Sequence, residues 1–352
     1  MLSRLIPQHK VDRMASLLDR AEHVVLVGHT SPDGDALGAT LAMWHFLKSK
    51  GKDATVVMPN AFPDTLSWLP GAKDVVLHSA DAGRAEAVMA AADVICCLDF
   101  NAPKRVGALG DALVASGAVK LMVDHHPDPE GFCGLVISHP ELSSTSELVF
   151  RLICAMGCWY DLSYESAVCI CTGMMTDTGG FTYNANNPET YYIVGKLLEK
   201  GIDKDDIYRR VFNTQTEVRM RLVGHMLTDC MAVLQDYASA VIILTKDDFA
   251  KYPIRKGETE GFVNMPLSIK GIIFSAFMRE DKDMIKVSLR SVGDFPCNEV
   301  AQKYFGGGGH KNASGGEYYG SMDEARDLLK KALFDFQDRL LQARRENEEA
   351  AT

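Results

Sequence analysis

The sequence predicts an α/β protein in two parts, an N-terminal domain built on a parallel sheet and a smaller C-terminal α/β domain. Apolar runs of strand length alternate with helix-like segments through the first half, which is typical of a parallel sheet covered by helices on both faces. The second half changes character and contains two strand-like segments that predict a hairpin. The chain has 352 residues, which is longer than one typical domain.

Strand-like runs rich in apolar and β-branched residues make up the predicted N-terminal sheet. They cover residues 24–29, 54–59, 74–79, 93–100 and 119–126. Helical composition is found between several of them, at residues 35–51, 82–92 and 105–115. The chain then becomes mainly helical over residues 143–157, 163–180 and 188–201.

A charged, helix-prone connector at residues 203–229 leads into the second half. Its strands are predicted at residues 239–245, 271–280 and 284–293, with the last two forming the hairpin. A helix at 298–305 precedes a glycine-rich stretch, and a long final helix begins at about 322 and ends in a frayed tail, 344–352. We expect the domains to cover residues 1–205 and 229–345, joined by a linker at 206–228.

Composition and charge favour a cytoplasmic enzyme that acts on a small substrate. The net charge of −10 argues against a basic track for long duplex nucleic acid. No apolar run approaches the roughly 20 residues needed to span a membrane, and the start of the chain has no apolar signal segment. The nine cysteines form no CxxC pair and sit mostly in apolar runs, so we expect buried thiols in a reducing compartment.

Carboxylates and imidazoles follow the predicted strands where ligands bind in α/β sheets, at the carboxyl ends. The clusters are His29, Asp33 and Asp35 after the first strand, Asp99 after 93–98, Asp124, His125 and His126 after 119–123, and Asp177 at a helix end. Each Asp alone is readily explained as a helix cap or turn residue. Together they predict a site for two divalent ions, and the mixture of carboxylate and imidazole without thiolate favours manganese.

A second candidate site is the glycine-rich segment at 305–318. Its consecutive glycines, including Gly308 and Gly309, let the backbone approach an anion, and His310 and Asn312 add hydrogen-bonding groups. Arg290 ends the preceding strand and can grip a phosphate with two parallel hydrogen bonds. A flexible loop and a routine surface arginine are the alternatives.

Four segments of the sequence resemble the metal-binding motifs of DHH phosphoesterases. They are GHTSPDGDALGA, CLDF, VDHH and MMTDTGGF, in that order, and GGGGHKNASGG resembles the signature loop of the DHH-associated C-terminal domain. Size and spacing are most similar to the NrnA group, which acts as oligoribonuclease and 3′-phosphoadenosine 5′-phosphate phosphatase. The resemblance implies an N-terminal DHH catalytic domain, a C-terminal substrate-binding domain, and an active site in the cleft between them.

The resemblance also implies a role for each residue. His29, Asp33 and Asp99 would hold one Mn²⁺, and Asp35, Asp99, His125 and Asp177 a second, with Asp99 bridging the two. His126 would act beside the scissile phosphate, and Asp124 would orient a histidine. Arg290, Gly308, Gly309, His310 and Asn312 would bind the rest of the substrate. Ser144 and Thr145, in a recurring family segment, would be structural or peripheral.

The expected function is manganese-dependent hydrolysis of phosphate esters in short oligonucleotides, dinucleotides or bisphosphorylated nucleosides, by a monomer or homodimer. One alternative is a phosphodiesterase for cyclic or linear signalling dinucleotides. A nucleotide-sensing protein without activity is a further alternative, against which the intact set of ligand residues argues.

Overall fold

The computed structural model describes residues 2–255 and 257–350. The chain divides into two compact units, Met1–Thr214 and Gln215–Thr352. Within the described residues, the structure contains no helix whose length and apolar character suit a bilayer crossing.

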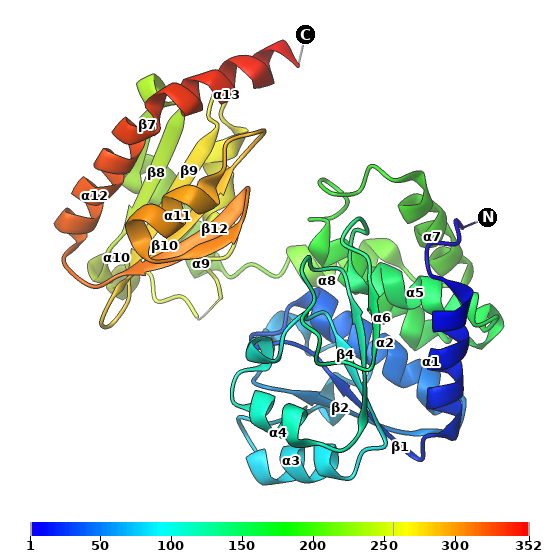
Figure 1. Ribbon diagram of the computed structural model, residues 1–352. Helices are drawn as coiled ribbons and strands as arrows, with labels where there is room; N and C mark the ends of the chain where they lie inside the picture. The colour runs from blue at the N-terminus through cyan, green and yellow to red at the C-terminus, as the bar shows by residue number, and fades with distance from the viewer. Residues whose placement is uncertain (1, 256, 351–352) are drawn as a thin grey trace. The chain divides into compact units, whose positions relative to one another are not determined.

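A parallel sheet forms the centre of the first unit (Figure 1). It has six strands in the order β3-β2-β1-β4-β5-β6. The strands are β1 His23–Val27, β2 Asp53–Met58, β3 Val76–Leu77, β4 Val94–Leu98, β5 Val119–Asp124 and β6 Leu135–Ser138. The helices are α1 Gln8–Arg20, α2 Gly34–Ser49, α3 Ala82–Ala90, α4 Leu109–Ala115, α5 Thr145–Ala155, α6 Tyr164–Asp177, α7 Pro188–Glu199 and α8 Lys204–Phe212. The parallel sheet predicted from the alternating pattern is therefore confirmed.

Alternate side chains of the central strands pack into two separate cores, one on each face of this sheet. In β1, Val24 and Leu26 join the core formed with α1, α2, α5 and α6, whereas Val25 and Val27 join the core under α3 and α4. Because successive side chains of a strand point to opposite faces, burial on both faces requires the continuous apolar runs seen in the sequence.

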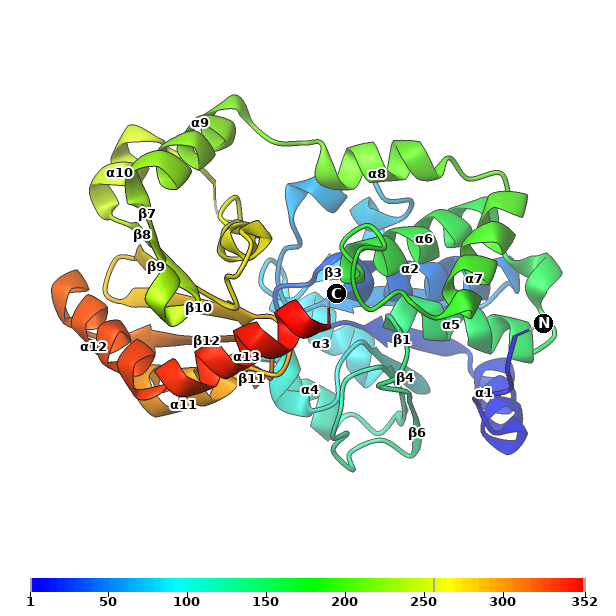
Figure 2. The ribbon, with the colours of Figure 1, turned by 90° about the horizontal axis from the view of Figure 1, so that it is seen from above.

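The second unit has a mixed six-stranded sheet in the order β11-β12-β10-β9-β8-β7, in which only β8 and β9 pair in parallel (Figure 2). Its strands are β7 Met231–Leu234, β8 Ser239–Leu244, β9 Phe274–Glu280, β10 Ile285–Ser291, β11 Gly308–His310 and β12 Ala313–Tyr318. Its helices are α9 Glu217–His225, a π-helical turn Met226–Cys230, α10 Lys246–Lys251, α11 Cys297–Phe305, α12 Met322–Asp335 and α13 Gln337–Glu349.

A hydrophobic core covers each face of the second sheet, as in the first unit. Helices α11, α12 and α13 pack on one face of the second sheet, and α9, the π-helical turn and α10 pack on the other. The hairpin predicted for 271–293 is confirmed as β9 and β10, which pair from Phe274–Ser291 to Glu280–Ile285.

Several predicted elements differ in extent or kind. The strand predicted at 74–79 is only Val76–Leu77, because residues 72–74 form a tight turn. The prediction of a single final helix is wrong, because α12 ends before Phe336 and α13 follows as a separate helix. The tail predicted to fray is helical to Glu349, although residues 351–352 lie outside the described part of the chain. The glycine-rich stretch is the β11–β12 hairpin rather than an irregular loop.

Candidate metal centre

The predicted ligand residues gather at the carboxyl edge of the first sheet, where the strand order changes direction between β1 and β4. His29 follows β1, Asp99 follows β4, and Asp124 ends β5 directly before His125 and His126. Two helices bring the other carboxylates to this edge. Asp33 and Asp35 lie at the start of α2, and Asp177 lies at the end of α6.

One group of possible ligands is formed by His29, Asp33 and Asp99, whose ligand atoms all lie within 4.8 Å of one another. The Nε2 atom of His29 is 3.4 Å from Oδ2 of Asp99 and 3.7 Å from Oδ1 of Asp33. Asp33 is also the N-cap of α2, and its side chain accepts hydrogen bonds from the amides of Asp35 and Ala36. The capping alternative is thus correct for Asp33, but it does not compete with a place in the site.

A second group is formed by Asp35, His125 and Asp177. The Nε2 atom of His125 lies 3.2 Å from Oδ2 of Asp177, 3.9 Å from Oδ2 of Asp35 and 3.6 Å from Oδ1 of Asp99. The two oxygens of Asp99 therefore face different groups, Oδ2 toward His29 and Oδ1 toward His125. This is the geometry expected of a carboxylate shared between two cations.

Both histidines present Nε2 to the carboxylates because their Nδ1 atoms lie near main-chain carbonyls. Nδ1 of His29 is 2.9 Å from the carbonyl oxygen of Thr30, and Nδ1 of His125 is 3.3 Å from that of Leu142. A donated Nδ1–H in this position selects the tautomer whose Nε2 lone pair can bind a metal. The donor set of imidazole nitrogens and carboxylate oxygens fits a hard-to-borderline divalent cation.

The N-terminus of α5 supports the site. The main-chain amides of Thr145 and Ser146 donate to the two oxygens of Asp35 over 2.7 and 2.9 Å, and the hydroxyl of Thr145 donates to Oδ1 of Asp99 over 2.9 Å. Of the two roles expected for Thr145, structural or peripheral, the structure supports the structural one, because its side chain contacts and supports the carboxylate of Asp99. Ser144 is structural as expected, since it caps α5 by accepting from the amide of Glu147.

Burial and mutual repulsion of the carboxylates shape the electrostatics of the site. Asp35 and Asp99 are almost wholly buried. Burial raises the pKa of Asp35, and the charges of Asp99 and Asp177 add to the shift. Burial also raises the pKa of Asp177 to about 7, although His125 opposes the increase. Such shifts indicate an excess of buried negative charge, which a cation would neutralise.

A positive charge on His29 offsets part of this buried negative charge. Burial alone would lower the pKa of His29, but its contacts with Asp33 and Asp99 outweigh burial and raise the pKa to about 11. Burial would raise the pKa of Asp99, but the hydrogen bond and charge of His29, and to a smaller extent the charge of His125, outweigh burial and lower the pKa to about 2. In the absence of a metal, a proton on His29 thus takes the position where a cation would bind.

His126 and Asp124 form a pair beside the second group. Nδ1 of His126 lies 2.9 Å from Oδ1 of Asp124 and 3.6 Å from Oδ1 of Asp99. Burial lowers the pKa of His126, but the hydrogen bond with Asp124 outweighs it and raises the pKa overall. Asp124 is fully buried and therefore holds the imidazole in a fixed orientation.

Close packing of α2 against α6 brings Asp35 and Asp177 to the same edge. A Cβ atom on Gly38 of α2 would lie 2.6 Å from the carbonyl oxygen of Cys169 on α6, and one on Gly173 of α6 would lie 2.8 Å from Oδ1 of Asp35 on α2 and 1.9 Å from Oγ of Ser146 on α5. Only glycine permits this helix–helix distance. Asp99 itself has a φ of +65°, a left-handed conformation that is uncommon for a non-glycine residue.

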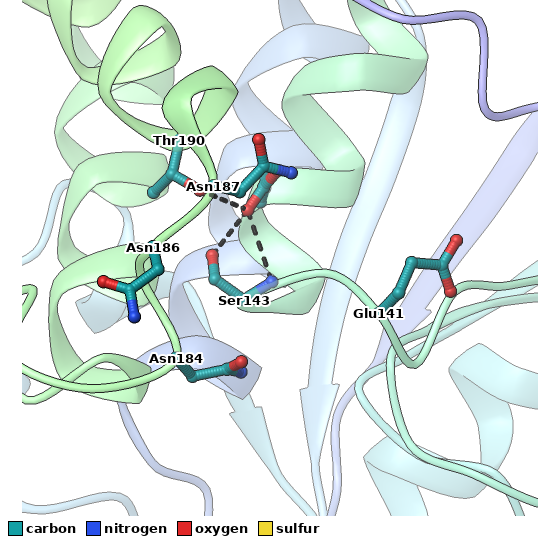
Figure 3. A pocket seen from close by; sticks show the side chains of 7 residues that line it. Glu141, Ser143, Asn184, Asn186, Asn187 and Thr190 are labelled. Atoms are coloured by element: carbon teal, nitrogen blue, oxygen red, sulfur yellow. Dashed lines mark hydrogen bonds between the residues drawn. The ribbon is translucent and has the colours of Figure 1, made fainter. Parts of the chain in front are cut away.

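A polar pocket of about 230 Å³ lies beside the start of α5 (Figure 3). The amide and hydroxyl of Ser143 and the hydroxyl of Thr190 donate to the carboxylate of Glu147, and these hydrogen bonds are the dashed lines that start from Ser143 and Thr190 in Figure 3. Glu147 also pairs with the buried Arg151 at 2.7 Å, which in turn pairs with Glu189. This network anchors the helix end that carries Thr145, and none of the predicted ligand residues lines the pocket.

In the second unit, the structure places Arg290 and His310 on the same row of the sheet. Both are register partners of Ala313, Arg290 on β10 and His310 on β11, with β12 between them. Residues paired in register point to the same face, so the two side chains lie on one face about 10 Å apart along the row. The side-chain nitrogen of Arg290 also donates to the carbonyl oxygen of Leu289.

The other predicted substrate-binding residues, Asn312, Gly309 and Gly308, have different surroundings. The amide nitrogen of Asn312 donates to Oγ of Ser291 and to the carbonyl oxygens of Gly293 and Phe295, so it fixes a loop within its own domain. Gly309 has a φ of +139°, and a Cβ there would lie 2.6 Å from the carbonyl oxygen of Ala313. Around Gly308, by contrast, a Cβ would meet open space, which leaves room for a ligand.

Comparisons with known proteins agree with this arrangement. The model of the DHH family N-terminal domain matches residues 23–174, and that of the DHHA1 domain matches residues 235–336. The bifunctional oligoribonuclease and PAP phosphatase NrnA of Thermus thermophilus is 27% identical over 92% of this chain and 93% of its own length. NrnA of Bacillus subtilis is also 27% identical, over 90% and 95%.

A crystal structure of an exopolyphosphatase-related protein from Bacteroides fragilis superimposes with a TM-score of 0.95. Its sequence is 55% identical, and the alignment covers 96% of this chain and 99% of that one. The two matched domains and the full-length relatives lead to one conclusion. The chain belongs to the DHH family, with a DHH domain followed by a DHHA1 domain, and it is a hydrolase that acts on phosphate esters.

Proposed function

We propose that the protein hydrolyses phosphate esters of very short nucleotides with two divalent cations, preferably manganese, held at the carboxyl edge of the first sheet. The observation that carries the proposal is Asp99, whose two oxygens face separate sets of ligand atoms, His29 on one side and His125 on the other. The NrnA relatives, named for oligoribonuclease and PAP phosphatase activities, support this substrate class.

The proposed ligands are His29, Asp33 and Asp99 for one cation and Asp35, Asp99, His125 and Asp177 for the other. Bound cations would supply Lewis-acid activation of water and neutralise the charge of the phosphate. The chain's own residues set the geometry. Thr145 fixes the shared carboxylate through its hydroxyl, and the amides at the start of α5 hold Asp35.

His126 is proposed to bind the phosphate that is cleaved and to give a proton to the leaving oxygen. The hydrogen bond with Asp124 outweighs burial and raises the pKa of His126, which favours the protonated imidazole that a general acid requires. The buried Asp124 contacts Nδ1 and so fixes the orientation of the imidazole.

The second domain is proposed to bind a phosphate other than the scissile one, through Arg290 and His310. Their shared row on the sheet provides two cationic or hydrogen-bonding groups on one face. A contact at one fixed distance would favour short substrates, because an acidic chain offers little further attraction to longer strands.

A substrate panel tests the proposal. Purified protein with manganese is incubated with labelled RNA of about 2 to 24 nucleotides, 3′-phosphoadenosine 5′-phosphate, cyclic dinucleotides and inorganic polyphosphate. We expect fastest turnover of dinucleotides or the bisphosphorylated nucleoside. Faster cleavage of the 24-mer than of the dimer would contradict length selection, and preference for cyclic dinucleotides would support the signalling phosphodiesterase.

The matched control is Asp99→Asn, which keeps the size of the side chain and the acceptor for Thr145 but removes the shared charge. We expect it to lose nearly all turnover on every substrate and to bind less metal per chain. Wild-type turnover with two cations retained would refute the assignment of Asp99. No turnover of any substrate by the wild type, with metal bound, would support the binding-protein alternative instead.

A further inference from the structure

A second cluster of metal-ligand side chains lies in the other unit, away from any motif of the family resemblance. It consists of His225, Cys230 and Asp248, whose ligand atoms lie within 4.8 Å of one another. Nε2 of His225 is 2.8 Å from Oδ1 of Asp248 and 3.4 Å from Sγ of Cys230. The imidazole thus faces a carboxylate and a thiol at once.

The backbone between His225 and Cys230 explains how residues five positions apart meet. In an α-helix, five residues make about 1.4 turns and point the two side chains to different faces. Here the helix α9 passes into a π-helical turn, Met226–Cys230, in which the hydrogen-bonded repeat is itself five residues. The π-helical turn therefore places Cys230 beside His225.

The other ring nitrogen of His225, Nδ1, also has a carboxylate partner. Nδ1 of His225 lies 2.7 Å from Oδ2 of Asp229, and its ring packs at 5.3 Å from that of Tyr252. Carboxylate, imidazole and metal in this order is the usual arrangement around a zinc-binding histidine, because the carboxylate fixes the tautomer that presents Nε2. Asp248 is fixed as well, since its other oxygen accepts from the amide and hydroxyl of Thr245 at the start of α10.

The spacing is close to that of a zinc site. Zn–N of about 2.0–2.1 Å and Zn–S of about 2.3 Å in tetrahedral geometry place nitrogen and sulfur about 3.6 Å apart, against the 3.4 Å between His225 and Cys230. Nitrogen and carboxylate oxygen would be about 3.4 Å apart, so the 2.8 Å contact to Asp248 must open by about 0.6 Å. A small rotation of one side chain is sufficient for that.

We propose that His225, Cys230 and Asp248 form a zinc-binding site with a fourth position for water, in which Asp229 orients the imidazole. The thiolate selects zinc over the manganese favoured by the carboxylate-rich centre of the first unit. The three ligands come from the end of α9, the π-helical turn and α10, so the bound ion ties both helices to one face of the second sheet.

Cobalt substitution of the full-length protein provides the test. Co²⁺ bound to a thiolate gives a near-ultraviolet charge-transfer band, whereas Co²⁺ bound by the cysteine-free centre of the first unit does not. After metal removal, we expect wild-type protein to develop this band with Co²⁺ and to lose it when one equivalent of Zn²⁺ is added. Asp99→Ala should retain the band, since that substitution lies in the other centre.

Two variants within the cluster, one behind His225 and one in the first unit make the result specific. Cys230→Ser should abolish the band, and Asp248→Asn, which keeps an acceptor for the helix cap, should weaken Zn²⁺ binding strongly. Cys158→Ser, at a half-buried free thiol of the first unit, should leave the band unchanged. Asp229→Ala should weaken Zn²⁺ affinity by about 10- to 100-fold, as substitution behind a metal-bound histidine usually does.

Melting curves in chelator show whether each variant folds, so loss of the band by a folded Cys230→Ser supports the proposal. The absence of a charge-transfer band in the wild type would overturn it and leave His225 as a hydrogen-bonded bridge between two carboxylates. A band that survives in folded Cys230→Ser, or that disappears in Cys158→Ser, would overturn it as well.

Discussion

Replacing Thr145 by Val tests whether the start of α5 organises the candidate metal centre. The substitution preserves side-chain shape and removes one hydrogen bond, the 2.9 Å contact from the hydroxyl to Oδ1 of Asp99. Both residues are buried, so water cannot easily replace the lost donor. A hydrogen bond to a charged group contributes about 1.5–3 kcal/mol, and loss of such a support usually costs about 10- to 100-fold in metal affinity or activity.

We therefore expect Thr145→Val to lower kcat/KM by about 10- to 100-fold at a fixed manganese concentration. Titration of turnover against manganese should show whether the loss is in cation affinity. Thr145→Ser is the matched control, because it keeps the hydroxyl and should remain close to wild type. Wild-type turnover in the valine variant, or an equal loss in the serine variant, would show that the hydroxyl does not support Asp99.

Three further predictions concern the choice of cation, the packing of α6 at Gly173, and the second domain. Manganese should restore more activity than magnesium at equal concentration after chelation, because imidazole is a poor ligand for magnesium; full recovery with magnesium alone would contradict the histidine-containing centre. Gly173→Ala should lower the free energy of unfolding by about 1–3 kcal/mol in thermal or urea denaturation, because its Cβ would lie 1.9 Å from Oγ of Ser146. Gly195→Ala is the control, since its Cβ would meet no neighbour, and it should be neutral or stabilising. Arg290→Ala should raise KM by about 10- to 150-fold for a dinucleotide with a second phosphate but change little for a chromogenic monoester, and equal losses on both would assign Arg290 to the chemistry or the fold.

The parallel sheet and the gathering of site residues could be predicted because both depend on local patterns. Continuous apolar runs predicted strands buried on two faces, and the Asp or His after each run had to lie at one edge of the sheet. The resemblance to DHH phosphoesterases predicted the grouping of these side chains, and the structure places His29 beside Oδ2 and His125 beside Oδ1 of Asp99.

The supporting contacts could not be predicted in the same way, because they join distant parts of the chain. Nothing local in SSTSE indicates that Thr145 donates to a residue 46 positions away. Nor does the sequence show that the side chain of Asn312 is engaged within its own domain, a role that depends on the conformation of residues 291–295. The π-helical turn that joins His225 to Cys230 also has no signature in residue type.

The contact between α5 and Asp35 affects how an inactive form of this enzyme should be made for trapping a substrate. Both oxygens of Asp35 accept amides at the start of α5, so replacing Asp35 would disturb a helix terminus as well as the chemistry. Asp177 lies at the end of α6, its side chain is 28% exposed, and it contacts His125 across the site. Asp177→Asn is therefore the better starting point for a folded, slow enzyme suitable for crystallography with substrate.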